Sequence, residues 1–211
     1  MRVMYLHGFA SGPHSRKATF FRERLEENGV SLSIPDLAGG DFRNLTLTSQ
    51  LKLIEQQVGG ENVFFIGSSM GGYLASLYAS SHSEVSGLIL LAPAFNFYAR
   101  WAALLGPEKM AEWRDRGEIS TYHYGECRDL ALSFRLMEDA KAYEPFPGFV
   151  QPCLIFHGVT DTTVPIVYSE GFVREHTNAR LIRLQSGHEM TDVLDNVWTE
   201  AAPNLFKALG R

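Results

Sequence analysis

A serine set between a strand-like and a helix-like segment is the feature of this sequence best suited to chemistry. Residues 67–71 read Gly-Ser-Ser-Met-Gly, which fits G-x-S-x-G in one frame only and singles out Ser69. Four apolar residues, 63–66, precede the motif, and small, helix-forming residues follow it. A sharp turn from strand to helix holds such a serine in a strained conformation with its hydroxyl projecting. The pattern therefore predicts that Ser69 is a nucleophile.

The same stretch has an alternative interpretation as a glycine-rich loop that binds phosphate or merely joins a strand to a helix. A phosphate-binding loop would carry a lysine in G-K-[ST] or the spacing G-x-G-x-x-G. Neither pattern occurs here. The nucleophile is the better interpretation.

His188 is the candidate for the base that takes the proton of Ser69. Among the seven histidines it alone lies in a loop directly after the last predicted strand, within Ser-Gly-His-Glu. His7 and His157 each end a predicted strand and precede a glycine, so we expect them to brace turns by hydrogen bonds. The position of His188 therefore favours it as the general base.

Asp161 is the candidate for the acid that orients this histidine and stabilises the imidazolium. It follows another predicted strand, in His-Gly-Val-Thr-Asp-Thr-Thr-Val-Pro. Asp192 and Asp195 are the alternatives, but both sit near the expected start of the last helix, where the helix dipole favours a carboxylate. The predicted catalytic residues are therefore Ser69, Asp161 and His188.

Acyl transfer also needs two donors for the oxyanion of the tetrahedral intermediate. The backbone N–H of Met70 is the first, because it follows the nucleophile at the start of a helix. The second is expected in the loop after the first strand, His-Gly-Phe-Ala, with the N–H of Phe9 as first choice and that of Ala10 as second.

Strand-like and helix-like segments alternate over most of the chain. Apolar runs predict strands at 2–6, 30–34, 63–66, 85–91, 153–156 and 180–184. Helices are predicted at 15–28, at 45–58, from the serine motif to about residue 81, at 166–176 and at 192–209. Such alternation predicts an α/β fold with a mostly parallel sheet and helices on both faces. The candidate residues then meet at the edge where the strands end.

Residues 94–148 interrupt this alternation and are rich in aromatic side chains. Helices are expected at 98–105, 108–116 and 128–143, and residues 122–124 could form a short strand or hairpin. Because the segment follows the strand after the serine motif, we expect it to cover the site. Phe95, Phe97 and Trp101 are then candidates for lining an acyl pocket, although aromatic residues at helical spacing also commonly pack into a core.

Composition narrows the class of protein. A chain of 211 residues is expected to form a single domain, 1–211, with a cap-like insertion at about 94–148. A net charge of −5 without a basic cluster argues against nucleic acid and anionic membranes as partners, and no apolar run approaches a membrane span. The first residues show no signal peptide, and two cysteines, Cys127 and Cys153, fit a reduced, cytoplasmic protein. No H-x-x-x-H pair occurs, so neither a metal nor another cofactor is expected.

The motifs HGFASGP, GSSMGG, HGVTDTTVP and SGHE, in this order, resemble the serine-hydrolase branch of the α/β-hydrolase superfamily. They are most similar to the small bacterial esterases of the YqiA/YcfP type. The resemblance implies an α/β-hydrolase fold with about six main strands, lacking two N-terminal strands of the full-sized fold, and a small cap. It also implies hydrolysis of carboxylic esters or thioesters of small to medium acyl groups, through an acyl-enzyme on Ser69.

Two other classes of function stay open. The same three residues would serve an amide, peptide or C–C bond hydrolase. A hydrolase-fold protein can also bind a small ligand without turning it over. The sequence predicts a small-molecule ester or thioester as the partner and leaves the oligomeric state open.

Overall fold

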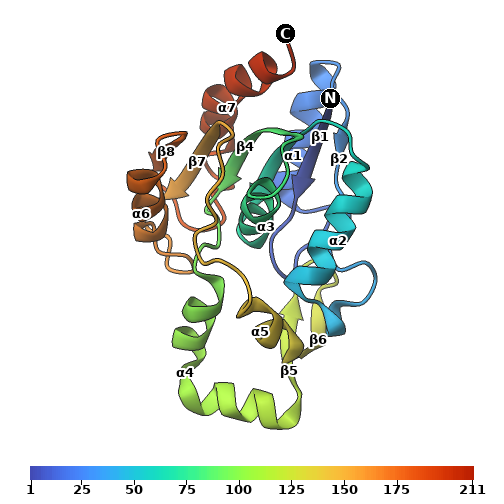
Figure 1. Ribbon diagram of the computed structural model, residues 1–211, viewed down its shortest axis with the longest axis vertical. Coiled ribbons are helices and arrows are strands. Elements are labelled where there is room, and N and C mark those ends of the chain that lie inside the picture. Colours follow the sequence, from blue (N-terminus) through green and yellow to red (C-terminus); the bar gives the residue numbers. More distant parts are fainter.

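Six parallel strands form the central sheet of the computed structural model, which describes residues 1–211 (Figure 1). Their order across the sheet is β2-β1-β3-β4-β7-β8, and every neighbouring pair is parallel. The strands are β1 (Arg2–Leu6), β2 (Leu32–Ser33), β3 (Val63–Ser68), β4 (Val85–Leu91), β7 (Cys153–Gly158) and β8 (Ala179–Leu184). The prediction of a parallel sheet of about six main strands is confirmed, although the predicted strand at 30–34 shrinks to two residues at the sheet edge.

Helices cover both faces of this sheet, as predicted (Figure 1). α1 (Arg16–Glu27) and α7 (Leu194–Ala208) pack on one face, where their apolar side chains share a buried cluster with the strands. The other face carries α2 (Leu47–Val58), α3 (Met70–Ala79) and α6 (Val167–Glu175), with a short 3-10 helix, η1 (Phe42–Asn44), before α2. No helix combines the length and the apolar character needed to cross a membrane.

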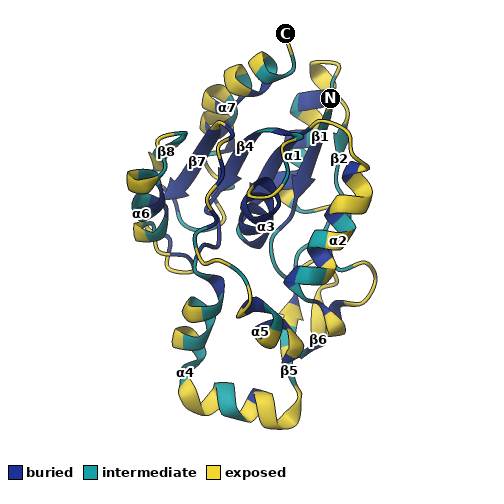
Figure 2. Ribbon diagram, viewed as in Figure 1, coloured by how far each residue is buried: buried dark blue, intermediate teal, exposed yellow.

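The central strands are buried on both sides, which explains their nearly continuous apolar sequences (Figure 2). Along β3, Phe64 and Ile66 point to the cluster under α1 and α7, whereas Val63 and Phe65 point to the cluster under α2 and α3. This alternation follows from the two-residue period of a strand. The sheet is therefore a rigid platform, and its strand ends are fixed in place.

The segment between β4 and β7 lies beyond the carboxyl ends of the strands (Figure 1). It contains α4 (Phe97–Arg116), the hairpin of β5 (Glu118–His123) and β6 (Arg128–Ser133), and α5 (Arg135–Ala140). Gly106, with φ of 76°, and Pro107 bend α4 where the sequence suggested two separate helices. We call residues 97–140 the cap.

The predicted helix at 128–143 is wrong in its first half, where the chain forms β6. Leu130 and Leu132 alternate with polar or small residues, which is the two-residue period of a strand, and β6 pairs with β5 along its whole length. Arg, Leu and Ala favour helices in isolation, but hairpin pairing outweighs this weak local preference. Helix α5 begins only at Arg135.

The helix after the serine motif lies unusually close to the first strand. A Cβ atom on Gly71 would overlap the carbonyl oxygens of Leu6 and His7. These are main-chain atoms, which cannot rotate away as a flexible side chain can. Glycine at this position therefore sets how closely α3 approaches the end of β1.

Gly71→Ala should consequently destabilise the protein by about 3 kcal/mol or more, at the upper end of what overpacking costs. Urea unfolding followed by circular dichroism measures this loss. Gly12→Ala is the matched control, because Gly12 has no atom within 4 Å of its would-be Cβ, and it should change stability by about 0.5 kcal/mol or less. Equal stability of the two variants would contradict the assigned contact.

Candidate active site

Ser69 occupies the sharp turn between β3 and α3. Its φ of 52° and ψ of −115° lie in a region that residues with a side chain rarely adopt. The turn is held from both sides, because the Ser69 N–H donates to Leu91 O at 2.8 Å and the Ser69 carbonyl accepts from Ala94 N–H at 2.9 Å. The surrounding structure thus maintains a strained backbone at the predicted nucleophile.

Glycines make room for this turn. A Cβ atom on Gly67 would lie 2.7 Å from the Cα of Gly72, so the strand and the helix that it leads into approach too closely for a side chain. The short spacing places the start of α3 directly under Ser69. The N-terminus of the helix, with its unpaired N–H groups, therefore faces the space around the serine.

His188 connects Ser69 to Asp161. Its Nε2 lies 3.1 Å from the Ser69 Oγ, and its Nδ1 lies 2.7 Å from the Asp161 Oδ2. The three residues come from the loops after β3, β7 and β8, at the same edge of the sheet. The structure therefore brings together the three side chains that the sequence singled out, within hydrogen-bond reach of one another.

The carboxylate of Asp161 is fully buried and accepts hydrogen bonds on both oxygens. Its Oδ1 accepts from the N–H groups of Thr163 and Val164, each at 2.8 Å, and its Oδ2 from His188. Burial by itself raises the pKa of this carboxyl, but the hydrogen bonds from His157, His188 and Val164 outweigh it and hold the pKa far below its usual range. Asp161 is therefore ionised beside the histidine.

His157 is a second histidine on the same carboxylate. Its fully buried ring places Nε2 3.2 Å from the Asp161 Oδ2 and 2.8 Å from the Val164 carbonyl, and Nδ1 2.8 Å from the Ser169 hydroxyl. A carbonyl only accepts, so Nε2 carries the proton and Nδ1 accepts from Ser169. His157 braces its loop as predicted. Its bond to the acid was not predicted, although it stands four residues before Asp161.

The two alternative acids lie elsewhere. Asp192 accepts a hydrogen bond from the Ser186 hydroxyl at 2.5 Å, and Asp195 pairs with Arg24 on the surface at 2.7 Å. Neither is a hydrogen-bond partner of His188. Asp161 is thus the only carboxylate bonded to this histidine.

The two expected oxyanion donors belong to segments close to Ser69. Met70 opens α3, so its N–H has no partner within the helix. Phe9 lies in the loop after β1, and its N–H donates no backbone hydrogen bond. A Cβ atom on Gly8 would be 3.5 Å from the Cβ of Ser69, which shows how closely this loop passes. Ala10, the second choice, has a φ of 52° and accepts from Tyr124 N–H through its carbonyl.

His7 fixes the start of that loop, as expected. Its Nε2 accepts from the Leu37 N–H at 3.1 Å, so Nδ1 carries the proton and donates to the Gly8 carbonyl at 3.0 Å. Burial lowers the pKa of this buried ring, which favours the same neutral form. His7 therefore joins the loops after β1 and β2.

The three candidate pocket residues differ in their surroundings. Phe95 is fully buried and stacks on Phe172 of α6, with ring centroids 4.5 Å apart. Phe97 is buried beside Tyr73 of α3. Trp101 is only partly buried and meets the ring of Phe9 edge-on at 5.0 Å. Of the three, Trp101 alone combines an exposed part with a contact to the loop beside Ser69.

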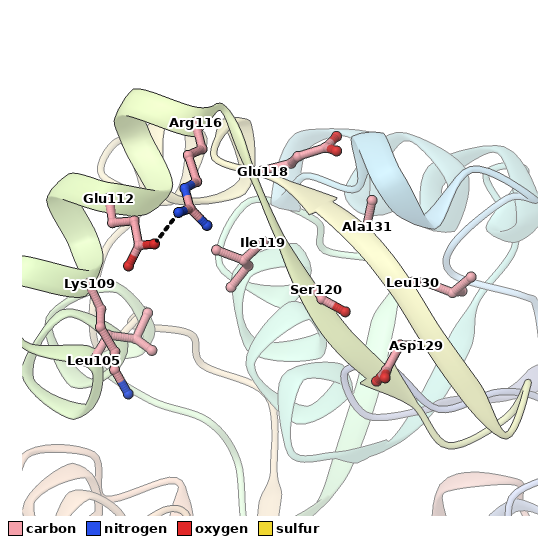
Figure 3. A pocket seen from close by; sticks show the side chains of 10 residues that line it. All are labelled: Leu105, Lys109, Glu112, Arg116, Glu118, Ile119, Ser120, Asp129, Leu130 and Ala131. Atoms are coloured by element: carbon pink, nitrogen blue, oxygen red, sulfur yellow. Dashed lines mark ion pairs between the residues drawn. The ribbon is translucent and has the colours of Figure 1, made fainter.

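A hollow of about 620 Å³ lies on the cap, between the second half of α4 and the hairpin (Figure 3). Its lining includes the ion pair of Glu112 with Arg116, at 3.0 Å, and it contains none of Ser69, Asp161 and His188. Among its charged side chains, Glu112 and Arg116 pair with each other, and Glu118 pairs with Arg43 outside the hollow. The hollow is therefore separate from the three side chains that meet at Ser69.

Metal ligands are not gathered at any point of the structure. No group of three or more His, Cys, Asp or Glu side chains is arranged so that it could hold a metal ion. Cys127 and Cys153 are both free thiols, the first exposed and the second buried.

Comparison with known proteins places the chain in a family. A sequence model of the family described as "Uncharacterised protein family (UPF0227)" matches residues 2–202. The chain belongs to the UPF0227 family. Among curated proteins, this UPF0227 chain is similar to a thermostable monoacylglycerol lipase of Bacillus sp. (strain H-257). The two are 25% identical over 182 residues, which cover 77% of this chain and 71% of the lipase.

Solved structures show the same fold. Est1E from Butyrivibrio proteoclasticus, with ferulic acid bound, matches with a TM-score of 0.84 and 23% identity, over 99% of this chain and 89% of that one. The mouse alpha/beta hydrolase domain-containing protein 10 matches with a TM-score of 0.81 and 20% identity, over 98% and 90% of the two chains. The predicted α/β-hydrolase fold of the UPF0227 protein is therefore confirmed.

The low pKa of Asp161 links the stability of this UPF0227 protein to acid pH. The native state keeps the carboxylate ionised after the unfolded chain has bound a proton, near pH 3.9. The resulting stabilisation is complete above that pH and is lost as the pH falls towards the native pKa. Between pH 5 and pH 2.5 the free energy of unfolding of the wild type should fall by on the order of 1–2 kcal/mol more than that of Asp161→Asn. Urea unfolding across this pH range measures the difference. An equal loss of stability in the two proteins would contradict a lowered pKa of Asp161.

Proposed function

We propose that this protein is a serine hydrolase that cleaves carboxylic ester or thioester bonds of small to medium acyl substrates through an acyl-enzyme on Ser69. One observation carries the proposal: the Ser69 hydroxyl on a strained turn lies 3.1 Å from a histidine whose other nitrogen is held by the buried, ionised Asp161. This arrangement suits activation of a hydroxyl and has no evident structural task that would justify the backbone strain.

The first half-reaction follows from the roles of the three groups. The Ser69 Oγ attacks the acyl carbon while His188 Nε2 accepts its proton. Asp161 keeps the proton of the imidazole on Nδ1, so that Nε2 is free to act as the base, and it stabilises the imidazolium that forms. His188 then gives the proton to the leaving alcohol or thiol as the bond to the acyl carbon breaks.

Two N–H groups are available for the negative charge that develops on the carbonyl oxygen. In this proposal they are those of Met70, at the start of α3, and of Phe9, in the loop that passes close to Ser69. Loss of one donor of this kind typically costs roughly 2.7–4 kcal/mol of transition-state stabilisation. Rigid main-chain donors supply it without reorganisation during the reaction.

Water completes the cycle. It attacks the acyl carbon of the acyl-enzyme while His188 Nε2 takes one of its protons, and the same imidazolium then protonates Ser69 as the acid leaves. No step uses a cofactor. The same groups therefore act twice, once on the substrate and once on the intermediate.

Relatives support an ester as the substrate. The similar Bacillus protein is a monoacylglycerol lipase, and the structure similar in fold from Butyrivibrio proteoclasticus holds ferulic acid. An apolar wall of Trp101 and Phe9 beside Ser69 suits an acyl chain or ring. Thioesters would react by the same steps. The preference of the protein between thioesters and oxygen esters remains to be measured.

The direct test replaces each serine of the motif in turn. Ser69→Ala should abolish hydrolysis of p-nitrophenyl esters and labelling by a fluorophosphonate, because the attacking oxygen is lost while the fold is kept. Ser68→Ala is the matched control and should keep most of the activity, because Ser68 is a buried residue at the end of β3 without a hydrogen bond to His188. Acyl-CoA thioesters in the same panel measure the thioester preference.

Two results would count against the proposal. Activity in Ser69→Ala but not in Ser68→Ala would move the nucleophile to the other serine. Stoichiometric labelling of wild-type Ser69 without turnover of any ester or thioester would favour a binding protein that has kept an activated serine.

Trp101→Ala tests the acyl pocket. Removal of the ring should open space beside Phe9 and shift the preference in a C2 to C10 ester series towards longer chains. One methylene in a hydrophobic pocket changes kcat/KM by roughly 10–200-fold, so the shift should be visible. Leu104→Ala is the control on the same helix, because Leu104 is 76% exposed and joins neither core cluster. An unchanged profile in folded Trp101→Ala would place the acyl chain elsewhere.

A further inference from the structure

A buried lysine on the opposite side of the sheet from the cap reaches the loop that carries the histidine. Lys17 lies in the first turn of α1, and only 9% of its side chain is exposed. Its Nζ donates to the main-chain carbonyl of Glu189, directly after His188, at 2.9 Å. The steps assigned to Ser69, Asp161 and His188 do not use this ammonium group, so its burial needs another explanation.

The contact is not an ordinary surface ion pair. The carboxylate of Glu189 is 3.4 Å from the Lys17 Nζ and 76% exposed, so water competes strongly for it. The carbonyl of the same residue is closer, at 2.9 Å. Burial lowers the pKa of Lys17, although Glu189 opposes this shift, so the ammonium is held in place against a desolvation cost. The main-chain carbonyl is the better partner.

The loop around His188 is held by hydrogen bonds from residues of other segments. On the near side, the Ser186 carbonyl accepts from the N–H and the hydroxyl of Thr160, at 3.1 Å and 2.9 Å. On the far side, Met190 has a φ of 49° and a buried side chain. The carbonyl of Glu189 lies between His188 and this turned residue. The loop also closes on itself, because the Ser186 hydroxyl donates to Asp192 at 2.5 Å, and Lys17 is the side chain from α1 that holds it on the far side of the histidine.

Lys17 also belongs to the segment that carries an oxyanion donor. The chain runs from Phe9 to Ser15, whose hydroxyl accepts from Ala18 N–H at 3.4 Å and caps α1, and then to Lys17. A single segment thus passes beside Ser69 and reaches the histidine loop. A displacement of α1 would move both parts of the site.

We propose that Lys17 is a positioning residue for the base: its ammonium group holds the Glu189 carbonyl and thereby fixes the place of the His188 ring against Ser69. The inference rests on the proposed function, because it assigns Lys17 a role in the reaction of that site. Lys17 does not touch the substrate. It acts through the backbone of the loop.

The test is Lys17→Met, which keeps an apolar stem of similar length and removes the ammonium. On a p-nitrophenyl ester, kcat should fall roughly 10- to 100-fold, in line with the effect of a misplacement of about 1 Å, while KM stays within about threefold. If Lys17 only stabilised the fold, its replacement would lower the melting temperature without lowering kcat at nearly constant KM. Lys17→Arg, which keeps the charge and the donors, should restore most of kcat.

Glu189→Gln is the matched control. It keeps the main-chain carbonyl and removes the exposed carboxylate, so it should retain at least about half of wild-type kcat if the carbonyl is the partner that matters. A folded Lys17→Met protein with wild-type kcat would overturn the inference. A loss in Glu189→Gln equal to that in Lys17→Met would also overturn it, since the ion pair and not the carbonyl would then be responsible.

A second readout separates this inference from the proposed function. If the wild type hydrolyses no ester or thioester, the proposed function fails. The Nδ1–H proton resonance of His188, assigned by its absence in His188→Gln, still reports on the ring. Lys17→Met should shift or broaden this resonance, and Glu189→Gln should leave it in place. An unchanged resonance in Lys17→Met would overturn the positioning role without any measurement of turnover.

Discussion

The backbone of Ser69 is the constraint on which the rest of the structure depends. A residue with φ of 52° and ψ of −115° is costly, on the order of 1–3 kcal/mol, and persists only where its neighbours leave no alternative. Here β3 and α3 are each buried, and the turn between them is held by the Ser69 N–H donating to the Leu91 carbonyl and the Ala94 N–H donating to the Ser69 carbonyl. The sheet thus supplies the stability that keeps one hydroxyl in an otherwise unfavourable position.

The electrostatics of the site follow from a second constraint, the burial of Asp161. A buried carboxylate is stable only when hydrogen bonds replace its water. Two N–H groups of its own loop occupy Oδ1, and His157 and His188 share Oδ2, so the charge has four donors. Only His188 continues from there to Ser69. His157 therefore stabilises the charge of Asp161, whereas His188 links that charge to Ser69.

The sequence predicted the parts of this protein that depend on local rules. The central strands have apolar runs because they are buried on both faces, and Ser69 and Asp161 follow two of them, β3 and β7. His188 follows the partly exposed strand β8, and parallel topology brings all three residues to one edge of the sheet. The strand β6 was missed because its residues favour helix in isolation and only pairing with β5 decides otherwise. The contact of Lys17 with Glu189 joins residues 172 positions apart and leaves no local pattern.

The cap also supports the loop after β1, which is far from it in the sequence. The hairpin turn donates from Tyr124 N–H to the Ala10 carbonyl at 2.7 Å, and the ring of His123 packs edge-on against Phe42 at 4.7 Å. Ala10 has a φ of 52°, so the loop that carries Phe9 also contains strain that neighbours must support. Two sets of hydrogen bonds support this loop: those of His7, to Gly8 and Leu37, and the one from Tyr124 of the cap to Ala10. A substitution in the hairpin can therefore act on the loop that carries Phe9 without touching a substrate. If this loop serves the proposed reaction, effects of cap variants on its rate and on its chain-length preference have separate physical origins.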